Sequence, residues 1–245
     1  LHGATSAGQQ GNSIVALRRE RAQPAQAPRS PEGAVFCSLV RRVPRGRHQP
    51  RTRREELTVR ITTLIDNRPS PDDPQLTAEW GLSLCVELNG RHLLVDMGAS
   101  DAFARNAARL SIDIAAVDVA ILSHHHYDHG GGLRRFLELN DHAEIYLGAA
   151  PDGDPTVKLL GFVRKYIGLD QALLARHAHR FRFVRERTEV LPGAFVLPRS
   201  GGQHARPAGN RFLYLKRGSD LVPDDFRHEI VVAIREHDAL VVLTA

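Results

Sequence analysis

The sequence predicts an α+β fold in which helices cover β-sheets, and two observations support this. Residues 82–88 alternate apolar and polar side chains, and an Asn89-Gly90 pair separates them from the apolar run at 93–95. An Asn-Gly pair between two such runs is the strongest short-range signal for a β-hairpin. The residues that follow predict a helix, a buried strand, a histidine-rich loop and a second helix, an order that fits sheets covered by helices.

Apolar periodicity and turn residues place the other elements along the chain. Alternation at Val59 and Ile61 starts the first strand, and Ser100 is a candidate cap for the first helix. We expect strands at 59–65, 117–122 and 143–147, helices at 100–110, 133–139, 157–167 and 170–177, and short strands at 181–183, 190–191, 195–197, 212–215, 226–234 and 239–244. The last two are expected to form a hairpin that turns at His237-Asp238.

The first 57 residues differ in composition from the rest of the 245-residue chain. They hold eleven arginines, no lysine and four glutamates, which is a charge of +7, and the net charge of +5 therefore leaves −2 for residues 58–245. Arg, Pro and Gln dominate without periodicity, which predicts a disordered leader at 1–57 and a folded domain at 58–245. An organelle transit peptide or an artefactual upstream extension would have the same composition.

Three further features of the sequence bear on the start of the chain, on its compartment and on membrane association. The chain begins with Leu1 and its only methionine is Met97, so we expect a processed N-terminus or a fragment, and we favour the fragment. Cys37 and Cys85 are isolated, which predicts neither a zinc knuckle nor a disulfide framework and favours the reduced cytoplasm. No apolar run approaches the roughly 20 residues that span a bilayer, so no membrane association is expected.

The segment at 123–130 carries the chemistry. It contains His124-x-His126-x-Asp128-His129 between a predicted apolar strand and three glycines. On an extended segment, residues two apart project to the same side, so His124 and His126 can reach one metal ion. Asp128 and His129 come after the chain has begun to turn and can face a second ion, and imidazole and carboxylate ligands suit zinc, iron or manganese.

The alternative for this segment is a histidine-rich surface loop that binds metals adventitiously. Its position after an apolar strand and before Gly130-Gly131-Gly132 argues for a functional loop on a rigid scaffold. Glycine permits tight turns and close approach of neighbouring backbone. We therefore favour a built metal site over an adventitious one.

The motif His124-x-His126-x-Asp128-His129 resembles the signature of the metallo-β-lactamase superfamily, and Asp96-Met97-Gly98 resembles its upstream Asp-x-Gly element. Other segments resemble the branch grouped with the synthase of the dihydropterin-linked ribofuranosylaminobenzene phosphate of methanopterin biosynthesis. These segments are Ile65-Asp66-Asn67, Glu79-Trp80-Gly81-Leu82-Ser83, Asn106 and Lys165-Tyr166-Ile167-Gly168. The superfamily resemblance spans about 58–139 and implies a four-layer αββα sandwich, incomplete at the C-terminus.

The resemblance also implies roles for residues of the loop. His124 and His126 would bind a first ion, and Asp128 and His129 a second, with Asp128 also orienting a hydroxide that bridges the two ions. Asp96 would hold the loop by hydrogen bonding and would not bind metal. The implied cofactor is a pair of divalent metal ions, zinc in the first place, with manganese and iron as alternatives.

The superfamily completes its site with a further histidine for each ion and usually a bridging aspartate. In this branch the next ligand follows a strand that resembles 240–244, and the sequence ends at Ala245. With two protein ligands per ion, metal affinity is expected to be poor. Missing strands and a missing helix are also expected to leave apolar sheet faces uncovered.

Other polar residues have no ligand-like spacing. His125 and Tyr127 fall at variable positions of the motif and are predicted to pack or to line the rim. The histidines outside the motif considered as substitutes are predicted to be surface or packing residues: His142, His177, His179, His204, His228 and His237. Asp224, Asp225 and Glu229 are candidates to line the cleft, and a solvated charged turn is the alternative for them.

The leading functional hypothesis is hydrolysis of an ester, amide, thioester or phosphoester of small-molecule size, with a metal-bridging hydroxide as the nucleophile. A pterin-pathway transfer enzyme on the same scaffold is the first alternative. The second is a non-catalytic, truncated metal-binding module, in which case this chain is itself inactive. Nuclease activity is disfavoured, because residues 58–245 are net negative and hold no basic stretch interleaved with aromatic residues.

Overall fold

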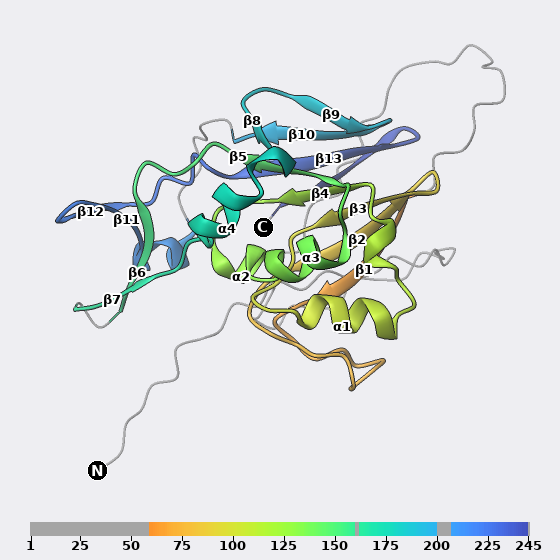
Figure 1. Cartoon of the computed structure of the whole chain (residues 1–245), viewed down its shortest axis with the longest axis horizontal. Helices are drawn as coiled ribbons and strands as arrows, with labels where there is room; N and C mark the ends of the chain where they lie inside the picture. Colours follow the sequence, from red (N-terminus) through yellow and green to blue (C-terminus); the bar gives the residue numbers. More distant parts are fainter. Residues whose placement is uncertain (1–58, 160–161, 200–206, 245) are drawn as a thin grey trace, which may run out of the picture.

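The computed structural model describes residues 59–159, 162–199 and 207–244. The predicted leader at 1–57 and His204 lie outside the described residues. Among the described helices, none has both the length and the apolar character needed to cross a bilayer. Three sheets and the helices packed beside them make up the described part of the chain (Figure 1).

The largest sheet has six strands in the order β1-β2-β3-β4-β5-β8 and positions the histidine loop. Its strands are β1 (Val59–Ile65), β2 (Ser83–Leu88), β3 (Arg91–Val95), β4 (Val119–Leu122), β5 (Glu144–Gly148) and β8 (Phe181–Val184). β1, β2 and β3 pair antiparallel, whereas β3, β4, β5 and β8 run parallel. The predicted β2–β3 hairpin is confirmed, and both of its turn residues, Asn89 and Gly90, have positive φ, as a type I′ turn requires.

The second sheet has four antiparallel strands in the order β14-β13-β10-β9. They are β9 (Thr188–Leu191), β10 (Ala194–Pro198), β13 (Ile230–Glu236) and β14 (Ala239–Leu243). The predicted hairpin at the end of the chain is confirmed as β13–β14, with positive φ at His237. The strand predicted at 226–234 begins only at Ile230, because the chain turns between Phe226 and Glu229.

The third sheet corrects one prediction. Residues 157–167 were expected to form a helix, but they belong to two strands of a four-stranded antiparallel sheet in the order β12-β11-β6-β7. The strands are β6 (Asp154–Leu159), β7 (Val163–Tyr166), β11 (Leu213–Arg217) and β12 (Asp220–Pro223). β6 pairs with β11, which lies more than fifty residues later, and this non-local pairing overrides the local helical pattern.

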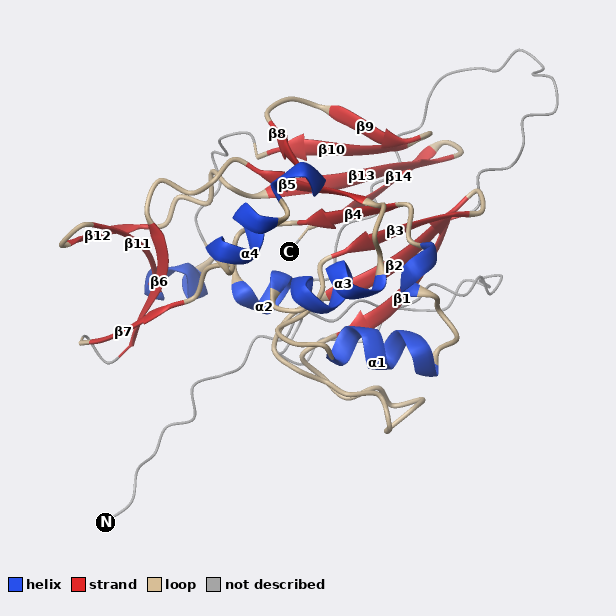
Figure 2. Ribbon diagram, in the orientation of Figure 1, coloured by secondary structure: helices blue, strands red, loops and turns tan. Residues whose placement is uncertain are grey.

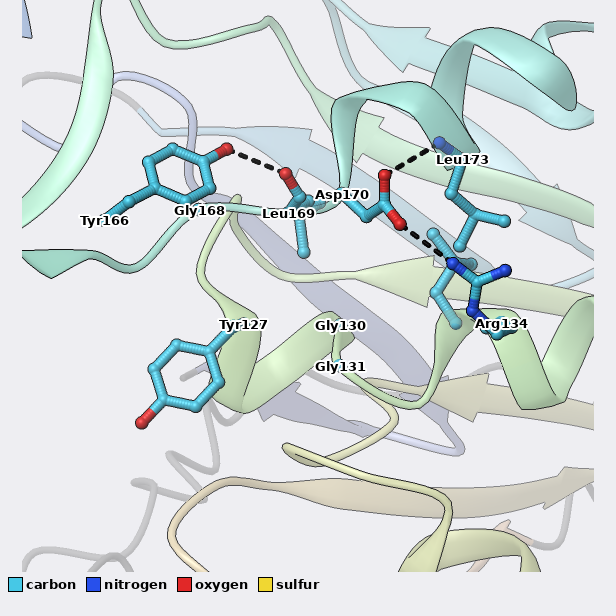
Figure 3. A pocket seen from close by; sticks show the side chains of 10 residues that line it. Tyr127, Gly130, Gly131, Arg134, Tyr166, Gly168, Leu169, Asp170 and Leu173 are labelled. Carbon is cyan, nitrogen blue, oxygen red and sulfur yellow. Dashed lines mark hydrogen bonds and ion pairs between the residues drawn. The ribbon is translucent and has the colours of Figure 1, made fainter.

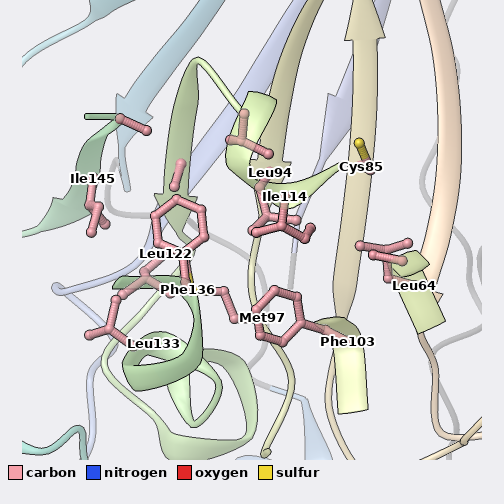
Figure 4. Close-up of a cluster of buried hydrophobic side chains, with 14 of the residues drawn as sticks. Leu64, Cys85, Leu94, Met97, Phe103, Ile114, Leu122, Leu133, Phe136 and Ile145 are labelled. Atoms are coloured by element: carbon pink, nitrogen blue, oxygen red, sulfur yellow. The ribbon is translucent and has the colours of Figure 1, made fainter. Parts of the chain in front are cut away.

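The helices pack on one face of the six-stranded sheet (Figure 2). They are α1 (Ala102–Arg109), α2 (Tyr127–Gly130), α3 (Leu133–Leu139) and α4 (Gln171–Arg176), with short 3₁₀ turns at η1 (Ile114–Ala116) and η2 (Ala178–Arg180). A further 3₁₀ turn, η3 (Ala208–Phe212), lies beside β6 of the third sheet. Figure 4 shows the core beneath them, in which Phe103 of α1 and Phe136 of α3 face Leu94 and Leu122 of the sheet. Both phenylalanines are fully buried.

A second core joins the two larger sheets. Leu93 and Val95 of β3 pack with Val196 of β10 and Val232 of β13, all of them buried. Three layers therefore stack in the described chain: the helices, the mixed six-stranded sheet and the four-stranded sheet β14-β13-β10-β9, while the third sheet, β12-β11-β6-β7, is not part of this stack. The structure is an α/β arrangement with mixed sheets, and the fourth, helical layer of the predicted αββα sandwich is not among the described residues.

Candidate metal centre

The histidine loop starts where β4 ends. β4 is buried along its whole length between β3 and β5, so its carboxyl end lies at the middle of the parallel part of the sheet. The chain bends at residues 123–125, the backbone of His126 is extended, with φ −101° and ψ 148°, and α2 begins at Tyr127. His124 and His126 therefore project before the turn, and Asp128 and His129 project from the first helical residues after it.

Two glycines let other segments approach the loop closely. Gly81 has φ +142°, and a Cβ there would lie 2.0 Å from the carbonyl oxygen of Asp128. Gly131 donates its N–H to the carbonyl of Gly98 at 2.9 Å, and a Cβ on it would lie 2.1 Å from the carbonyl oxygen of Ala99. Side chains at either position would push the loop away from the segments that hold it.

Asp96 is the anchor beneath the loop. It is fully buried at the end of β3, and its backbone N–H donates to Ile121 on β4 at 2.8 Å. Its Oδ1 accepts the Ser123 N–H at 2.7 Å. Its Oδ2 accepts the Ser123 hydroxyl at 2.7 Å and the Nδ1–H of His129 at 2.7 Å. This carboxylate sits where the resemblance implied a residue that holds the loop by hydrogen bonding.

The same network sets the tautomers of two histidines. Because His129 donates from Nδ1 to Asp96, neutral His129 carries its lone pair on Nε2. The Ser123 hydroxyl gives its only proton to Asp96, so its oxygen accepts from His124 Nδ1 at 2.9 Å. His124 is therefore also left with a lone pair on Nε2. Both imidazoles are oriented as metal-binding histidines usually are, with the other nitrogen held by a hydrogen bond.

The structure gathers the four predicted side chains into two adjoining groups. Ligand atoms of His124, Asp128 and His129 all lie within 4.8 Å of one another. His126 also lies beside two residues from outside the motif, and its ring centroid lies 4.5 Å from that of His124. The pairing implied by the resemblance, with His124 and His126 on one ion and Asp128 and His129 on the other, stays a prediction.

The second group contains two residues that the sequence did not identify as ligands: Asp224 was a candidate to line the cleft, and His228 was predicted to be a surface or packing residue. Asp224 and His228, on the turn before β13, lie with their ligand atoms within 4.8 Å of those of His126. Asp224 is 0% exposed and His228 is 1% exposed, so neither belongs to a solvated turn. A hydrogen bond from the Ile230 N–H to the Ser123 carbonyl, 2.8 Å long, ties the start of β13 to the end of β4. The available signal was an Asp and a His four residues apart before an apolar run.

Burial and nearby charges set the protonation of these groups. Burial, and then the neighbouring imidazoles, hold the pKa of His124 well below its usual value, so this ring stays neutral. Burial lowers the pKa of His129, but the charge and hydrogen bond of Asp96 outweigh it and the net pKa is raised. Burial raises the pKa of Asp224, but its contacts with His126 and His228 outweigh it and keep the carboxylate ionised.

Divalent cations fit these residues. The site offers buried imidazoles and carboxylates, the donor types that zinc and similar ions take. His126 Nε2 is buried, makes no hydrogen bond within the described part of the chain and lies 3.5 Å from Asp224 Oδ2. A buried polar nitrogen in that state is costly unless something binds it, and a cation between the nitrogen and the carboxylate would do so.

A cavity of about 310 Å³ lies beside the loop but does not include these histidines (Figure 3). Tyr127, Tyr166 and the ion pair between Arg134 and Asp170 line it, and Asp170 also caps α4 by accepting the Leu173 N–H. The Tyr166 hydroxyl donates to the Leu169 carbonyl, so this group, like Arg134 and Asp170, already has a polar partner. The cavity lies between α2 and α4, and its lining among the described residues contains no second cluster of metal-ligating side chains.

Comparison with known proteins identifies the family. A model of the metallo-beta-lactamase superfamily matches residues 81–207, a range that contains Asp96 and the whole histidine loop. The chain belongs to this superfamily. The resemblance inferred from the motif is confirmed.

Individual relatives refine the placement within the superfamily. The chain is 30% identical to an uncharacterized protein of Methanocaldococcus jannaschii over 116 residues, 46% of this chain and 41% of that protein. It is 26% identical over 204 residues to the 7,8-dihydropterin-6-methyl-4-(beta-D-ribofuranosyl)-aminobenzene-5'-phosphate synthase of the same organism, 76% of this chain and 67% of the synthase. This chain is therefore a distant homologue of that synthase.

One solved structure resembles the fold over most of the described chain. Tm1679, a metal-dependent hydrolase of the beta-lactamase superfamily, matches with a TM-score of 0.60 and 28% sequence identity. The match covers 76% of this chain and 65% of that structure. The chain thus spans about two thirds of the length of this hydrolase and less than half that of the first relative.

Proposed function

We propose that this chain carries the site of a metal-dependent hydrolase that acts on an ester, amide or phosphoester. One observation carries the proposal: two buried groups of imidazoles and carboxylates adjoin at the carboxyl end of β4. Hydrogen bonds to Asp96 and Ser123 set the tautomers of two of these imidazoles. The similarity to a metal-dependent hydrolase of known structure supports the reaction class.

The residues of the site have separable tasks. Divalent cations bound here would activate water as a nucleophile at neutral pH and polarise a substrate oxygen. His124 and His126 would hold one cation, and Asp128 and His129 would hold the other. We assign to Asp128 the orientation of the attacking water, because its side chain is 17% exposed and so opens to solvent, whereas the histidine rings beside it are more deeply buried. Asp96 holds the loop in place through Ser123 and orients the ring of His129.

Metal analysis is the first test of this proposal. After dialysis against metal-free buffer and reloading with zinc or manganese, we expect two ions per chain, and turnover of members of a panel of esters, amides and phosphoesters. His126→Ala and Asp128→Ala should each lower turnover by more than about 100-fold, because each removes a group that acts at the reacting centre. Asp113→Ala, a matched control at the exposed cap of η1, should retain turnover. Undiminished turnover in both site variants would refute the mechanism.

A second candidate is a transfer reaction on a pterin-linked substrate. Distant homology to the dihydropterin synthase, over 76% of this chain, favours it specifically. The metal scaffold would be the same, so metal binding does not separate the two candidates. Product analysis separates the two candidates. A transfer reaction joins parts of two organic substrates, whereas hydrolysis in ¹⁸O-labelled water splits one substrate and labels one of the two products. Metal binding without either reaction would favour the third possibility, a non-catalytic metal-binding module.

The partners and compartment remain proposals of the same kind. We propose a small-molecule substrate and no nucleic-acid partner, because residues 58–245 carry a net charge of −2. We propose zinc as the resident metal, with manganese and iron as the alternatives. Membrane-free cytoplasmic residence follows from the absence of long apolar runs in the sequence and from its isolated cysteines. Metal analysis of protein purified without added metal and cell fractionation test these points.

A further inference from the structure

The edge strand of the third sheet, β7, ends beside the histidine loop. The Tyr127 N–H donates to the Ile167 carbonyl at 2.8 Å, and an isolated β-bridge joins His126 to Gly168. The Ile167 N–H donates in turn to the Pro155 carbonyl of β6, also at 2.8 Å. The end of β7 is therefore tied both to its own sheet and to the middle of the histidine motif.

Lys165 of β7 places a positive charge beside this loop. Its Nζ lies 5.6 Å from the centroid of the Tyr127 ring. A strand rises about 3.3 Å per residue, so the Cα atom of Lys165 is no more than about 10 Å from that of Gly168, which pairs with His126. The ammonium therefore lies within reach of a small molecule that is bound at the histidines.

Lys165 is exposed and has no carboxylate partner within the described part of the chain. Arg134 of α3, by contrast, pairs with Asp170 at 3.0 Å. Residues 155–159 and 162–166, which cover most of β6 and all of β7, hold three basic residues and no acid. The ammonium of Lys165 is thus open to a charged ligand.

Tyr127 offers a second donor next to that ammonium. Its side chain is 39% exposed, and its hydroxyl makes no hydrogen bond with any described residue. A phenol is protonated at neutral pH and can donate to an anion. A point charge from Lys165 and an O–H group from Tyr127 are therefore available together at the edge of the histidine loop.

The carboxylates whose charges act on Tyr127 are engaged elsewhere. Burial, and then the charges of Asp128 and Glu79, raise the pKa of Tyr127. Glu79 accepts the Ala99 N–H at 2.9 Å and the Ser100 N–H at 3.1 Å. Asp128 is a predicted metal ligand, and the charge of a divalent cation exceeds that of one carboxylate. With its cations bound, this side of the site should therefore attract an anion.

We propose that Lys165 and Tyr127 together bind an anionic group, a carboxylate or a phosphate, on a substrate whose scissile bond lies at the metal centre. The inference rests on the proposed function for the reaction at that centre. Lysine binds both kinds of anion as a point charge, and hydrogen bonds to ionised groups are stronger than neutral ones. Lys165 is thus a specificity-determining residue, and the substrate class is an ester, amide or phosphoester that carries a separate negative charge.

Two substrates that differ only in charge test this class. 4-Acetoxybenzoate carries a carboxylate, whereas methyl 4-acetoxybenzoate is uncharged and has the same scissile acetate. With the zinc-loaded full chain, we expect kcat/KM for release of acetate to be about 10-fold higher for the anion, because a hydrogen bond to a charged group contributes to its binding. Equal or lower values for the anion would overturn the inference.

Three variants of β7 assign that preference to one side chain. Lys165→Met keeps an aliphatic stem over the Tyr127 ring but removes the charge, and it should lower kcat/KM for the anion about 10-fold, mainly through KM. The value for the methyl ester should change by less than about twofold. Lys165→Arg should keep most of the preference. Arg164→Met is the matched control, since it removes a charge from the opposite face of β7, and it should change neither value. Equal losses on both substrates in Lys165→Met would contradict the proposal.

Anion binding can also be measured without turnover. Inorganic phosphate, and acetate in parallel, are titrated into the full chain after removal of metal, so that no cation can hold them, and the side-chain NMR signals of Lys165 and Tyr127 are followed. We expect a saturable shift with at least one anion, and a dissociation constant at least about fivefold higher in Lys165→Met than in Arg164→Met.

The outcomes of this titration separate the two hypotheses. No saturable shift in wild type, or equal constants in the two variants, would overturn the inference. Anion binding at Lys165 in a protein that hydrolyses no substrate when loaded with zinc would instead refute the proposed function and leave the anion site in place. Circular dichroism identifies any variant that fails to fold.

Discussion

The two candidate metal-binding groups adjoin, but they are built in different ways. His124, Asp128 and His129 lie within six consecutive residues at the end of one strand, and Asp96 on the neighbouring strand orients the rings. His126 meets its partners across two sheets, and the hydrogen bond from His125 to His228 spans 103 residues. The first group therefore depends on local chain geometry, whereas the second depends on how the sheets pack.

Residues of one short motif thus belong to two candidate groups that different contacts hold in place. His124 and His126 are members of neighbouring candidate groups, although only one residue separates them in the sequence, and the chain bends at residues 123–125. A carboxylate side chain, Asp96, fixes the first group, and backbone hydrogen bonds with the turn before β13 fix the second. A substitution that disturbs Asp96 alone, or only the contacts with the turn before β13, should therefore change metal affinity in one group more than in the other.

Removing the metal should lower activity more than any substitution, because it empties both candidate groups at once. Prolonged dialysis against a strong chelator is expected to lower hydrolysis by more than about 1000-fold, because the cations stabilise transition-state charge by several kcal/mol. Adding zinc or manganese back should restore the rate, which a steady-state assay would follow. Full activity in protein shown by elemental analysis to be metal-free would contradict the proposed chemistry.

Creating a cavity on one face of β3 or on the other should affect the two candidate groups differently. Leu93 faces the core between the two larger sheets and Leu94 faces the core under the helices, and both are 0% exposed. Each Leu→Ala substitution should lower the free energy of unfolding by about 2–5 kcal/mol in urea titrations. Only Leu93→Ala loosens the sheet that carries Asp224 and His228, so it alone should also weaken the second metal site. Equal metal affinities at that site in the two variants would argue against this coupling.

Replacing the anchor of the first group should give an intermediate effect. Asp96→Asn removes one acceptor oxygen beneath Ser123 and His129, and we expect metal affinity at the first group to fall by about 10- to 100-fold. Isothermal titration should show the second group affected less. Asp73→Asn is the matched control, since it removes a carboxylate that pairs with Arg109 at the surface, and it should leave both affinities unchanged.

The smallest expected effect is on the pH dependence of metal-free protein. Burial lowers the pKa of His125 to about 4, against the opposing hydrogen bond to Gly148. The unfolded chain takes up this proton near pH 6.5 and the folded chain does not, so stability falls as the pH drops below that value. From pH 6.5 to 5 this one group should cost about 1.5 kcal/mol.

Substituting that residue checks the sign and size of the effect. His125→Gln should flatten the fall in unfolding free energy between pH 6.5 and 5 by about 1.5 kcal/mol, measured by urea titration at each pH. His142→Gln, at an exposed histidine, should leave the fall as it is in wild type. A steeper fall in His125→Gln would show that the ring gains a proton, rather than excluding one, when the chain folds.

Sequence patterns predicted most elements near the site. Strict alternation and the Asn89-Gly90 turn identify β2 and β3, and Asp170 caps α4 as its position before an apolar segment suggests. The β6–β7 hairpin was missed, because Val157 to Ile167 has helical spacing and its pairing partner β11 is distant in sequence. Local periodicity does not record which distant strand completes a sheet.

The sequence alone identified the histidine loop and its possible ligand types, because the residues that build it are neighbours in the chain and directly follow one apolar strand. The burial of Asp224 and His228 and their position beside His126 were decided only in the tertiary structure. These features arise where β13 meets the end of β4, through the hydrogen bond from Ile230 to Ser123. Contacts between residues so far apart follow from sheet packing, which no local pattern encodes.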